Sequence, residues 1–484
     1  MSDDDAHRLV LRGAFATGAG FALKFGARLG FLILAGRLFG AAAFGSYSLG
    51  IAVVESGVGL AGLSMRKALF QLLDGREEGR TAGHVVLDAT VLVLIASAIV
   101  AAAIMIGSCV AAGGLPTDGP YQALFWLAPM VAGQAVAEVL LAAGRWKHLI
   151  RYEVVGRSLV EPYTQVAVAL AGWAAGWSMS ALIVAYWMGN ATLNAYAFVG
   201  VQRGLGSFEL RTYRLQWRRL AVIVRRVASN TATDLLNGIY ARVDLYIVGA
   251  VLGAGWAGIY AMAQQVATPI RQIRQSFDGL LVPLAARTVA ARGATATGTA
   301  LASAARLILA IQLPVILLFI AVGAKLLGLF GPAFAAGWIA LIVLATAEAI
   351  HAAFGTGDLM FVYLDPRRGL RQTAFGIAVG AGTAVLLLPV LGITGAAVAM
   401  LAGYLSRAAL RAWTLRRRFG VTVPLAHASG PLVAAMFGLS AVLLMRPIGD
   451  LPALAAGLAT YAAVIWAWLR ATGERLRLSG FEGA

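Results

Sequence analysis

Cysteine is almost missing from this chain of 484 residues, in which Cys109 is the single one. One thiol can form neither a disulfide framework within the chain nor a cluster of thiolates for metal or redox chemistry. Histidine is scarce too, with five residues, and no His and Cys residues are grouped with the spacing of a zinc site. The sequence therefore predicts no metal site and no cofactor, and it places Cys109 as a small apolar residue in a helix.

Charge is also scarce, because Asp, Glu, Lys and Arg make up 13% of the chain while hydrophobic residues make up 60%. Such a composition excludes a water-soluble globular protein and is typical of a polytopic membrane protein, whose partners include membrane lipids. The formal net charge is +17. It does not indicate nucleic-acid binding, since the basic residues lie in short connections between apolar runs. The start, MSDDDAHR, shows no cleavage site, so the first apolar run is expected to be retained.

Apolar windows that are long enough to cross about 30 Å of hydrocarbon recur about fourteen times. We therefore predict an all-α polytopic membrane protein. The predicted spans are approximately residues 13–38, 44–65, 84–112, 121–143, 158–176, 180–202, 227–252, 256–286, 299–323, 336–361, 372–391, 393–415, 429–445 and 451–469.

Lysine and arginine are concentrated in alternate connections between these spans. With the N-terminus inside, roughly 30 basic residues lie on the inner side and about 3 on the outer side, so the positive-inside rule predicts that both termini are cytoplasmic. We accordingly place the chain in a bacterial cytoplasmic membrane. The outer connections are short, with none much longer than about 15 residues, which leaves no room for a soluble outer domain.

A sequence repeat divides the chain. GRLFGAAAFGSYSL (36–49) matches GAVLGAGWAGIYAM (249–262) at a constant offset, and each copy falls at the outer turn of a predicted hairpin. The identical pairs are Gly36 and Gly249, Gly40 and Gly253, Ala41 and Ala254, Gly45 and Gly258, and Tyr47 and Tyr260. We predict a duplication that gives two six-helix lobes, as is common in transporters. The lobes are residues 1–202 and 227–418, and residues 419–484 add two helices and a cytoplasmic tail.

The connection between the lobes, residues 203–226, is basic. It contains RTYRLQWRRLAVIVRR, in which apolar residues alternate with arginines. This pattern is consistent with a helix that lies on an anionic cytoplasmic leaflet, and equally with a basic linker that has no further role.

The chain has no G-x-x-x-x-G-K-[ST] phosphate loop, so it does not hydrolyse ATP by that device. The informative residues are the ionisable ones inside the spans, because each costs roughly 2.5–3.5 kcal/mol at a helix centre unless it meets water or a partner. We expect such residues to line a cavity.

The first predicted span presents Thr17, Lys24 and Arg28 within about 40° of one face. Two cations one turn apart repel each other in an isolated helix. We favour an anion-binding wall. The alternative is that both cations are neutralised by Glu55 of the second span or by another buried carboxylate.

Polar faces recur in the second half. On span 256–286 four polar residues lie within about 60° of one another, namely Gln264, Arg271, Gln275 and Asp278. Arg274 lies at the edge of this face. Span 227–252 carries Asn230, Asp234, Asn237 and Asp244 on one face and Arg242 on another. For Arg242 and Asp244, an ion pair is favoured over contact with a ligand.

Span 336–361 carries Glu348, His351 and Asp358 within about 80° of one face. A carboxylate and an imidazole one turn apart inside a membrane can relay protons. They can also form a hydrogen-bonded tether between helices, and we favour the tether.

Four segments resemble, in order, a known family: LAGRLFGAAAFGSYSLGIAVVESGVGLAGL, ARVDLYIVGAVLGAGWAGIYAMAQQVA, LLGLFGPAFAAGWIALIVLATAEAI and LPVLGITGAAVAMLAGYLSR. They are similar to the polysaccharide-transporter branch (O-antigen and oligosaccharide-lipid flippases) of the multidrug/oligosaccharidyl-lipid/polysaccharide flippase superfamily. The resemblance covers nearly the whole chain.

This resemblance implies two lobes around a V-shaped central cavity that opens alternately inward and outward. It implies a lipopolysaccharide or exopolysaccharide biosynthesis flippase, not an enzyme, that carries a polyprenyl-diphosphate-linked oligosaccharide to the outer leaflet. Other polysaccharide-assembly proteins are further partners that it suggests. By helix and depth, Lys24 and Arg28 match one set of cavity cations of the related lipid II flippases, and Arg271 with Arg274 match the other.

Two other functions remain open. A drug/cation antiporter of the same superfamily needs carboxylates for organic cations, which Glu55, Glu348 and Asp358 could supply. A membrane-embedded glycan polymerase or ligase is disfavoured, because such enzymes bring catalytic groups to a large outer loop.

Overall fold

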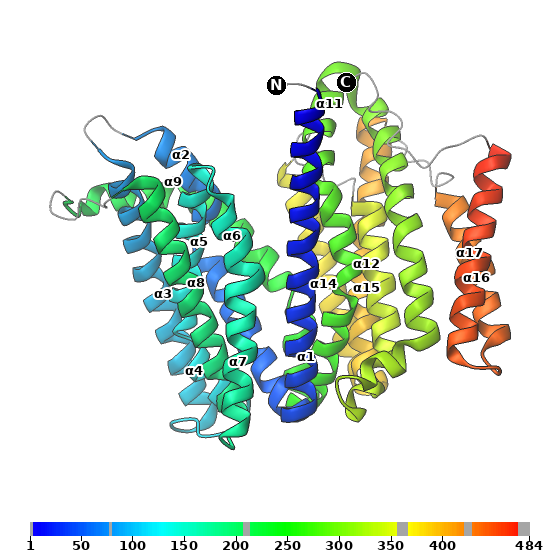
Figure 1. Ribbon diagram of the computed structural model, residues 1–484, viewed down its shortest axis with the longest axis horizontal. Coiled ribbons are helices and arrows are strands. Elements are labelled where there is room, and N and C mark those ends of the chain that lie inside the picture. Colours follow the sequence, from blue (N-terminus) through cyan, green and yellow to red (C-terminus); the bar gives the residue numbers. More distant parts are fainter. Residues whose placement is uncertain (1–2, 77–79, 207–212, 356–365, 421–427, 473–484) are drawn as a thin grey trace. The chain divides into compact units, whose positions relative to one another are not determined.

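The structure is a computed structural model that describes residues 3–76, 80–206, 213–355, 366–420 and 428–472. Every regular element in these ranges is helical (Figure 1). The helices are α1 (Asp3–Ala61), α2 (Met65–Asp74), α3 (Ala82–Ala112), α4 (Gly119–Leu127), α5 (Met130–Trp146), α6 (Ile150–Val155), a π-helical turn (Gly156–Val160), α7 (Glu161–Ala174), α8 (Met179–Leu205), α9 (Trp217–Tyr240), α10 (Val243–Leu252), α11 (Ala254–Gly328), a 3-10 turn (Pro332–Gly337), α12 (Trp338–Gly355), α14 (Pro366–Leu391), α15 (Ile393–Phe419), α16 (Ser429–Met445) and α17 (Asp450–Thr472).

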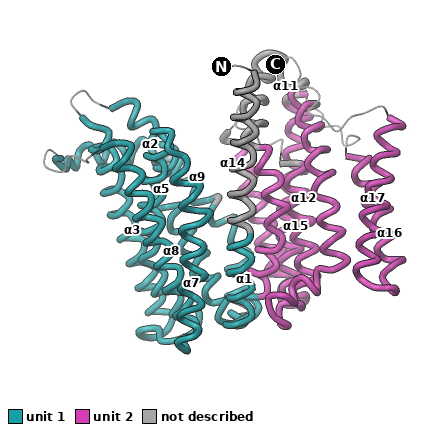
Figure 2. The backbone as a smooth tube through the Cα atoms, in the orientation of Figure 1, with its two compact units in different colours: residues 1–249, 253–258 teal, residues 250–252, 259–484 magenta. Residues whose placement is uncertain are grey.

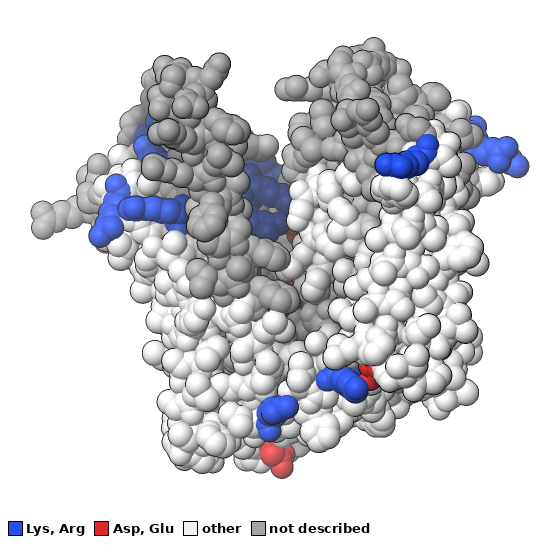
Figure 3. Space-filling model, turned by 45° about the vertical axis from the view of Figure 1, so that its right-hand side comes forward, with Lys and Arg blue, Asp and Glu red and all other residues white. Residues whose placement is uncertain are grey.

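The helices have the length and composition of membrane spans. Within the described ranges, seven helical segments are long and apolar enough to cross a membrane, and α4 with α5, which are bent by 41°, form an eighth candidate. On the face drawn in Figure 3, the described Lys, Arg, Asp and Glu side chains are gathered in a few groups, and broad parts of the described surface are uncharged. The expected all-α polytopic fold is confirmed, whereas the number of fourteen spans and the internal repeat stay predictions.

Glycine separates the two spans predicted on α1. Gly40 breaks this helix with φ 78° and ψ 175°, a conformation that glycine adopts without a steric penalty. Gly253, which precedes α11, has φ 84° and ψ 175°. These glycines are partners in the predicted repeat, so the chain passes the outer turn of both predicted hairpins with the same backbone conformation.

The chain packs into two compact units (Figure 2). Unit 1 contains residues 1–249 and 253–258, and unit 2 contains residues 250–252 and 259–484. α9 and residues 243–249 of α10 therefore pack with the first unit, although the repeat assigns residues 227–252 to the second lobe. The lobes are defined by the repeat and remain a prediction, while the units are defined by packing.

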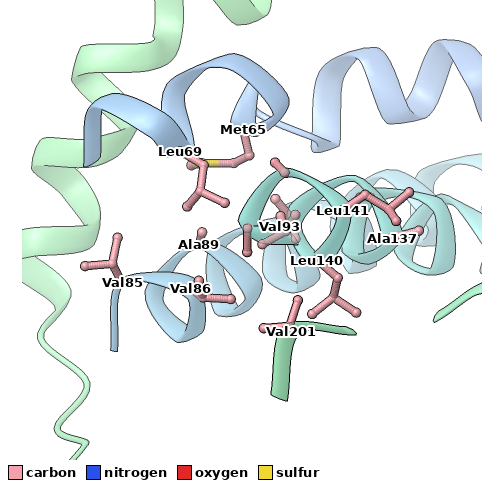
Figure 4. Packing of buried hydrophobic residues seen from close by; sticks show 14 of the residues in the cluster. Met65, Leu69, Val85, Val86, Ala89, Val93, Ala137, Leu140, Leu141 and Val201 are labelled. Carbon is pink, nitrogen blue, oxygen red and sulfur yellow. The ribbon is translucent and has the colours of Figure 1, made fainter. Parts of the chain in front are cut away.

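The core of unit 1 is an apolar cluster between α2, α3, α5, α8 and α9 (Figure 4). Leu69, Val86 and Val93 are completely buried in it. α9 adds Leu220 and Ile223, so the apolar face of the basic linker helix contacts the protein core. This burial positions α9 beside α1, where the polar contacts described below are formed.

Unit 2 brings its helices together through small residues. A Cβ added to Gly376 of α14 would lie 2.9 Å from the carbonyl oxygen of Gly403 of α15, and the reverse distance is also 2.9 Å. Such backbone approach is typical of packing inside membranes, where van der Waals contact replaces the hydrophobic effect. α17 contacts α11 through the Tyr461 hydroxyl, which donates to the carbonyl oxygen of Ala310 at 2.9 Å. The two C-terminal helices thus pack against the second half of α11.

Candidate functional site

The first cationic pair lies on α1. Arg28 is half-buried there, and the side chain of Lys24 lies outside the described residues. Glu55, the carboxylate considered as their alternative partner, forms an ion pair with Arg242 at the corner between α9 and α10. Asp244, the partner expected for Arg242, accepts a hydrogen bond from the backbone N–H of Leu245 at 2.8 Å.

More polar contacts within unit 1 join α1 and α2 to α9 and α10. Asp234 of α9 accepts hydrogen bonds from Ser64 at 2.6 Å and from Lys67 at 2.8 Å. The Tyr246 hydroxyl of α10 lies 2.6 Å from the carbonyl oxygen of Ala52 and 2.6 Å from the Ser56 hydroxyl. The carboxylates of Glu55 and Asp234 are therefore engaged by basic side chains, and the side chain of Asn237 lies outside the described residues.

The second cationic pair lies on α11, in unit 2. The Arg271 Nε atom is 3.2 Å from Glu348 Oε1 of α12, and the side chains are 35% and 5% exposed. Arg274 is half-buried one turn further along α11. Of the polar residues predicted beside them, Gln264 is buried and Gln275 is exposed. The side chain of Asp278 lies outside the described residues.

His351 of α12 has a different partner from Glu348. An Arg407 Nη2 atom of α15 lies 2.7 Å from His351 Nδ1. The imidazole also stacks on the Tyr404 ring with a centroid distance of 4.5 Å. Because Glu348 contacts α11 and His351 contacts α15, α12 connects both of these helices through polar groups. Asp358, the third polar residue predicted on this face, lies outside the described residues.

Sequence reasoning missed two buried arginines, Arg407 and Arg411 of α15, which are each 6% exposed. Arg411 donates a hydrogen bond to the Thr373 hydroxyl of α14 at 3.2 Å. The two arginines lie close to the basic run LRRRF at the end of the helix, and the positive-inside rule accounts for such residues without a site. Their spacing of one helical turn on a helix rich in Ala and Gly was the signal that could have revealed them.

Among the described residues, no group of three or more His, Cys, Asp or Glu side chains has the arrangement of a metal site. The charged groups of unit 2 instead include two guanidinium groups with partners on α12: Arg407 Nη2 lies 2.7 Å from His351 Nδ1, and Arg271 Nε lies 3.2 Å from Glu348 Oε1. Such an arrangement can bind an anion through charge-assisted hydrogen bonds.

Comparisons with solved structures show the fold. A lipid II flippase, MurJ, in an inward closed conformation has a TM-score of 0.72 at 12% identity, over 94% of this chain and 100% of that one. An inward-facing multidrug resistance MATE family transporter of the MOP superfamily has a TM-score of 0.61 at 15% identity, over 82% and 94%. A MOP superfamily transporter from Pyrococcus furiosus, described as having a binding pocket of reverse polarity, has a TM-score of 0.58 at 15% identity, over 85% and 95%.

A search of curated protein sequences finds no match. The family described as "Polysaccharide biosynthesis protein" matches residues 33–342, which is more than half of the chain. The multi-pass helical architecture and the fold shared with a flippase and with multidrug transporters agree with this match. The chain therefore belongs to the family described as "Polysaccharide biosynthesis protein", in agreement with its sequence resemblance.

Proposed function

We propose that this protein is a flippase that moves a polyprenyl-diphosphate-linked oligosaccharide from the inner to the outer leaflet of the cytoplasmic membrane by alternating access. The family match supports a role in polysaccharide biosynthesis. The fold shared with a lipid II flippase supports a lipid-linked substrate. In this proposal Lys24, Arg28, Arg271 and Arg274 bind the diphosphate, the oligosaccharide passes through a polar cavity, and the polyprenyl chain stays in lipid.

The observation that carries the proposal is the arginine pair on α11. Arg271 lies inside a predicted span and meets a buried carboxylate, yet its side chain keeps 35% exposure. A guanidinium presents a rigid fork of donors that matches phosphate oxygens, and the surrounding low dielectric strengthens that contact. A lipid diphosphate with about two negative charges can therefore compete with Glu348 for Arg271.

The proposal is tested by substituting Lys24→Ala, Arg28→Ala, Arg271→Ala and Arg274→Ala singly, and Lys24 with Arg28 together, in a strain that depends on this protein for surface polysaccharide. We expect surface polysaccharide to fall at least about tenfold at unchanged protein level, because each guanidinium or ammonium contact to phosphate contributes about 1.5–3 kcal/mol. Arg446→Ala is the control, since Arg446 is exposed and stacks over Trp338 at 4.9 Å. Full export with Lys24 and Arg28 both neutralised would overturn the anion-binding role of α1.

A drug/cation antiporter is the second candidate, and the fold shared with a MATE transporter favours it. Such a protein would use Glu55 and Glu348 to hold organic cations. Both carboxylates form ion pairs with arginines in this structure, which lowers their attraction for a cation. Expression in a drug-sensitive strain separates the candidates: an antiporter raises resistance to organic cations, and the flippase leaves resistance unchanged while restoring polysaccharide. Flanking glycosyltransferase genes would also favour the flippase.

A further inference from the structure

Two arginines of unit 1 converge on one tyrosine. The Tyr152 hydroxyl of α6 lies 3.2 Å from the Nη2 atom of Arg151 and 3.0 Å from the Nη1 atom of Arg203, which lies near the end of α8. Both arginines are exposed, whereas Tyr152 is only 4% exposed. Two guanidinium groups from different helices are therefore gathered around one buried phenol.

The packing of its ring holds this tyrosine in place. A Cβ added to Gly200 of α8 would lie 2.5 Å from the Tyr152 Cγ atom, so glycine is needed for the ring to lie this close to the helix. The Tyr196 ring lies beside it, with a centroid distance of 5.2 Å. Because the ring is fixed, its hydroxyl gives both arginines a rigid point of attachment.

Among the described residues, no carboxylate neutralises the two arginines. Glu153, the neighbour of Tyr152 in the sequence, forms an ion pair with Arg145 at 2.9 Å. Arg151 contacts Tyr152 through its hydrogen bond and by lying over the ring at 4.9 Å, and Arg203 contacts the same hydroxyl. A phenol oxygen orients a guanidinium but does not cancel its charge.

The Tyr152 hydroxyl has no acceptor in the part of the chain that the structure describes. Its oxygen accepts a hydrogen bond from each guanidinium, which occupies both lone pairs. The hydroxyl hydrogen therefore remains available to donate. Three donor groups, two of them charged, meet here without an acceptor, and phosphate oxygens are the acceptors that suit guanidinium groups best.

The place of these residues along their helices fits the headgroup region of a bilayer. Arg151 lies in the connection between two predicted spans, and Arg203 directly follows the predicted span 180–202. One turn further into the predicted spans, on the same helix faces, lie the exposed side chains of Val154 and Val199. The positive-inside rule predicts that this side is cytoplasmic, where the leaflet is anionic.

We propose that Arg151, Tyr152 and Arg203 bind the headgroup phosphate of an anionic phospholipid in the cytoplasmic leaflet. The site lies within unit 1, and it goes beyond the proposed transport because it does not involve the carried substrate. The positive-inside rule explains why arginines occur at these helix ends, but it does not require two of them to share one buried hydroxyl. That shared contact preorganises both guanidinium groups, so less conformational entropy is lost when a phosphate binds.

The test measures dissociation constants of the purified full-length protein for dioctanoyl phosphatidylglycerol, which is anionic, and for dioctanoyl phosphatidylcholine, which is zwitterionic. Arg218→Gln is the control for Arg151→Gln and Arg203→Gln, since Arg218 is an exposed arginine of α9 in the same unit. We expect Arg151→Gln and Arg203→Gln each to weaken phosphatidylglycerol binding about tenfold, and the control to weaken it less than about twofold. An equal loss in the control would show a general attraction to basic surfaces and would overturn the proposal.

Tyr152→Phe tests the same site without removing a charge, because the ring stays against Gly200 and only the hydroxyl is lost. We expect phosphatidylglycerol binding to weaken about threefold. This variant replaces the arginine variants if they do not purify as folded protein, and unchanged binding then refutes the proposal.

Farnesyl diphosphate distinguishes a phospholipid from the transported substrate. If the arginine variants lose affinity for farnesyl diphosphate and keep their affinity for phosphatidylglycerol, these residues serve the substrate and the phospholipid site is refuted. If the unsubstituted protein binds phosphatidylglycerol no more tightly than phosphatidylcholine, the phospholipid site is refuted as well. The proposed transport function stands in both cases.

Discussion

The arginines inside the spans are held by groups that differ in charge. Arg271 faces the carboxylate of Glu348, whereas Arg407 faces the imidazole of His351. A carboxylate neutralises its partner and competes with an anionic ligand, while a neutral acceptor only positions it. At the level of single residues, Glu348 is therefore expected to compete with an anionic ligand for Arg271.

This role predicts opposite effects of Glu348→Gln on stability and on affinity. Removing the carboxylate leaves Arg271 without its buried counter-charge, which costs about 3–5 kcal/mol of folding free energy. The same change removes a competitor, so we expect farnesyl diphosphate to bind more tightly and to restore part of the lost melting temperature. Thermal unfolding with and without the ligand measures both effects. Glu348→Asp keeps the charge and is the control, and a Glu348→Gln protein whose affinity does not rise would contradict the role.

Two glycines allow α1 and α11 to cross with their backbones in contact. This crossing is a property of the two helices and not of a single residue. A Cβ added to Gly45 of α1 would lie 1.8 Å from the carbonyl oxygen of Ala254, and one added to Gly258 of α11 would lie 2.0 Å from that of Ala41. The contact is reciprocal, and the same residues are partners in the predicted repeat. All four residues belong to unit 1. The start of α11 is thereby joined to the second half of α1.

Gly45→Ala and Gly258→Ala are therefore expected to destabilise the protein. The methyl group cannot fit unless the helices separate, and overpacking of this kind costs about 1–3 kcal/mol. Gly255→Ala is the matched control on α11, because a Cβ at Gly255 meets no atom within 4 Å. The measurement is the melting temperature in one detergent, and equal values for Gly45→Ala and Gly255→Ala would rule out the crossing.

The linker is attached to unit 1 by a hydrogen bond ahead of α9. The Tyr213 hydroxyl donates to Asp88 Oδ1 at 2.9 Å, while Arg80 holds the other carboxylate oxygen at 2.7 Å. Burial and the hydrogen bond to the Asp88 carboxylate raise the pKa of Tyr213 to about 12. Since the folded pKa is raised, the contribution of this bond is complete below the ordinary tyrosine pKa of about 10 and is lost as pH rises through about 12.

Tyr213→Phe is accordingly expected to speed tryptic cleavage of the arginine-rich linker at neutral pH, because the ring remains but its hydroxyl anchor is lost. Tyr121→Phe, at an exposed tyrosine of α4, controls for the loss of a hydroxyl. The rate of tryptic cleavage is measured for both variants by gel electrophoresis. Equal rates in the two variants would show that Tyr213 does not hold the linker.

The limits of sequence reasoning are visible in these elements. Hydropathy located the helices because each must satisfy its backbone polar groups and cover an apolar width. It predicted one span over residues 121–143 but not the bend of 41° between α4 and α5, where Pro129 lacks the N–H that a continuous helix requires. The partners of Glu55, Glu348 and His351 come from distant helices, so no spacing along the chain could identify them.

For the whole molecule, net charge movement follows from the proposed transport. Carrying about two negative charges outward across an inside-negative potential is favourable by roughly 4–5 kcal/mol per 100 mV, and the same field favours the return of an empty cationic site. We therefore predict that flipping is driven by voltage and that proton coupling is not obligatory. Proteoliposomes with a potassium diffusion potential and matched pH measure this, and flipping that ignores voltage and follows only a pH gradient would refute it.

The ion pairs of α1 and α2 with α9 and α10 also have a consequence for biosynthesis. The ribosome completes Glu55 and Lys67 long before it reaches Asp234, Arg242 and Gly258. Until those partners are synthesised, the charged side chains of α1 and α2 therefore lie in the translocon or in lipid without them. Domains generally fold in the order in which they are synthesised. A chain interrupted at the basic linker would release helices with these groups still unmatched. Quality-control proteases should remove such a fragment, so the first half of the protein depends on its continuation as far as the start of α11.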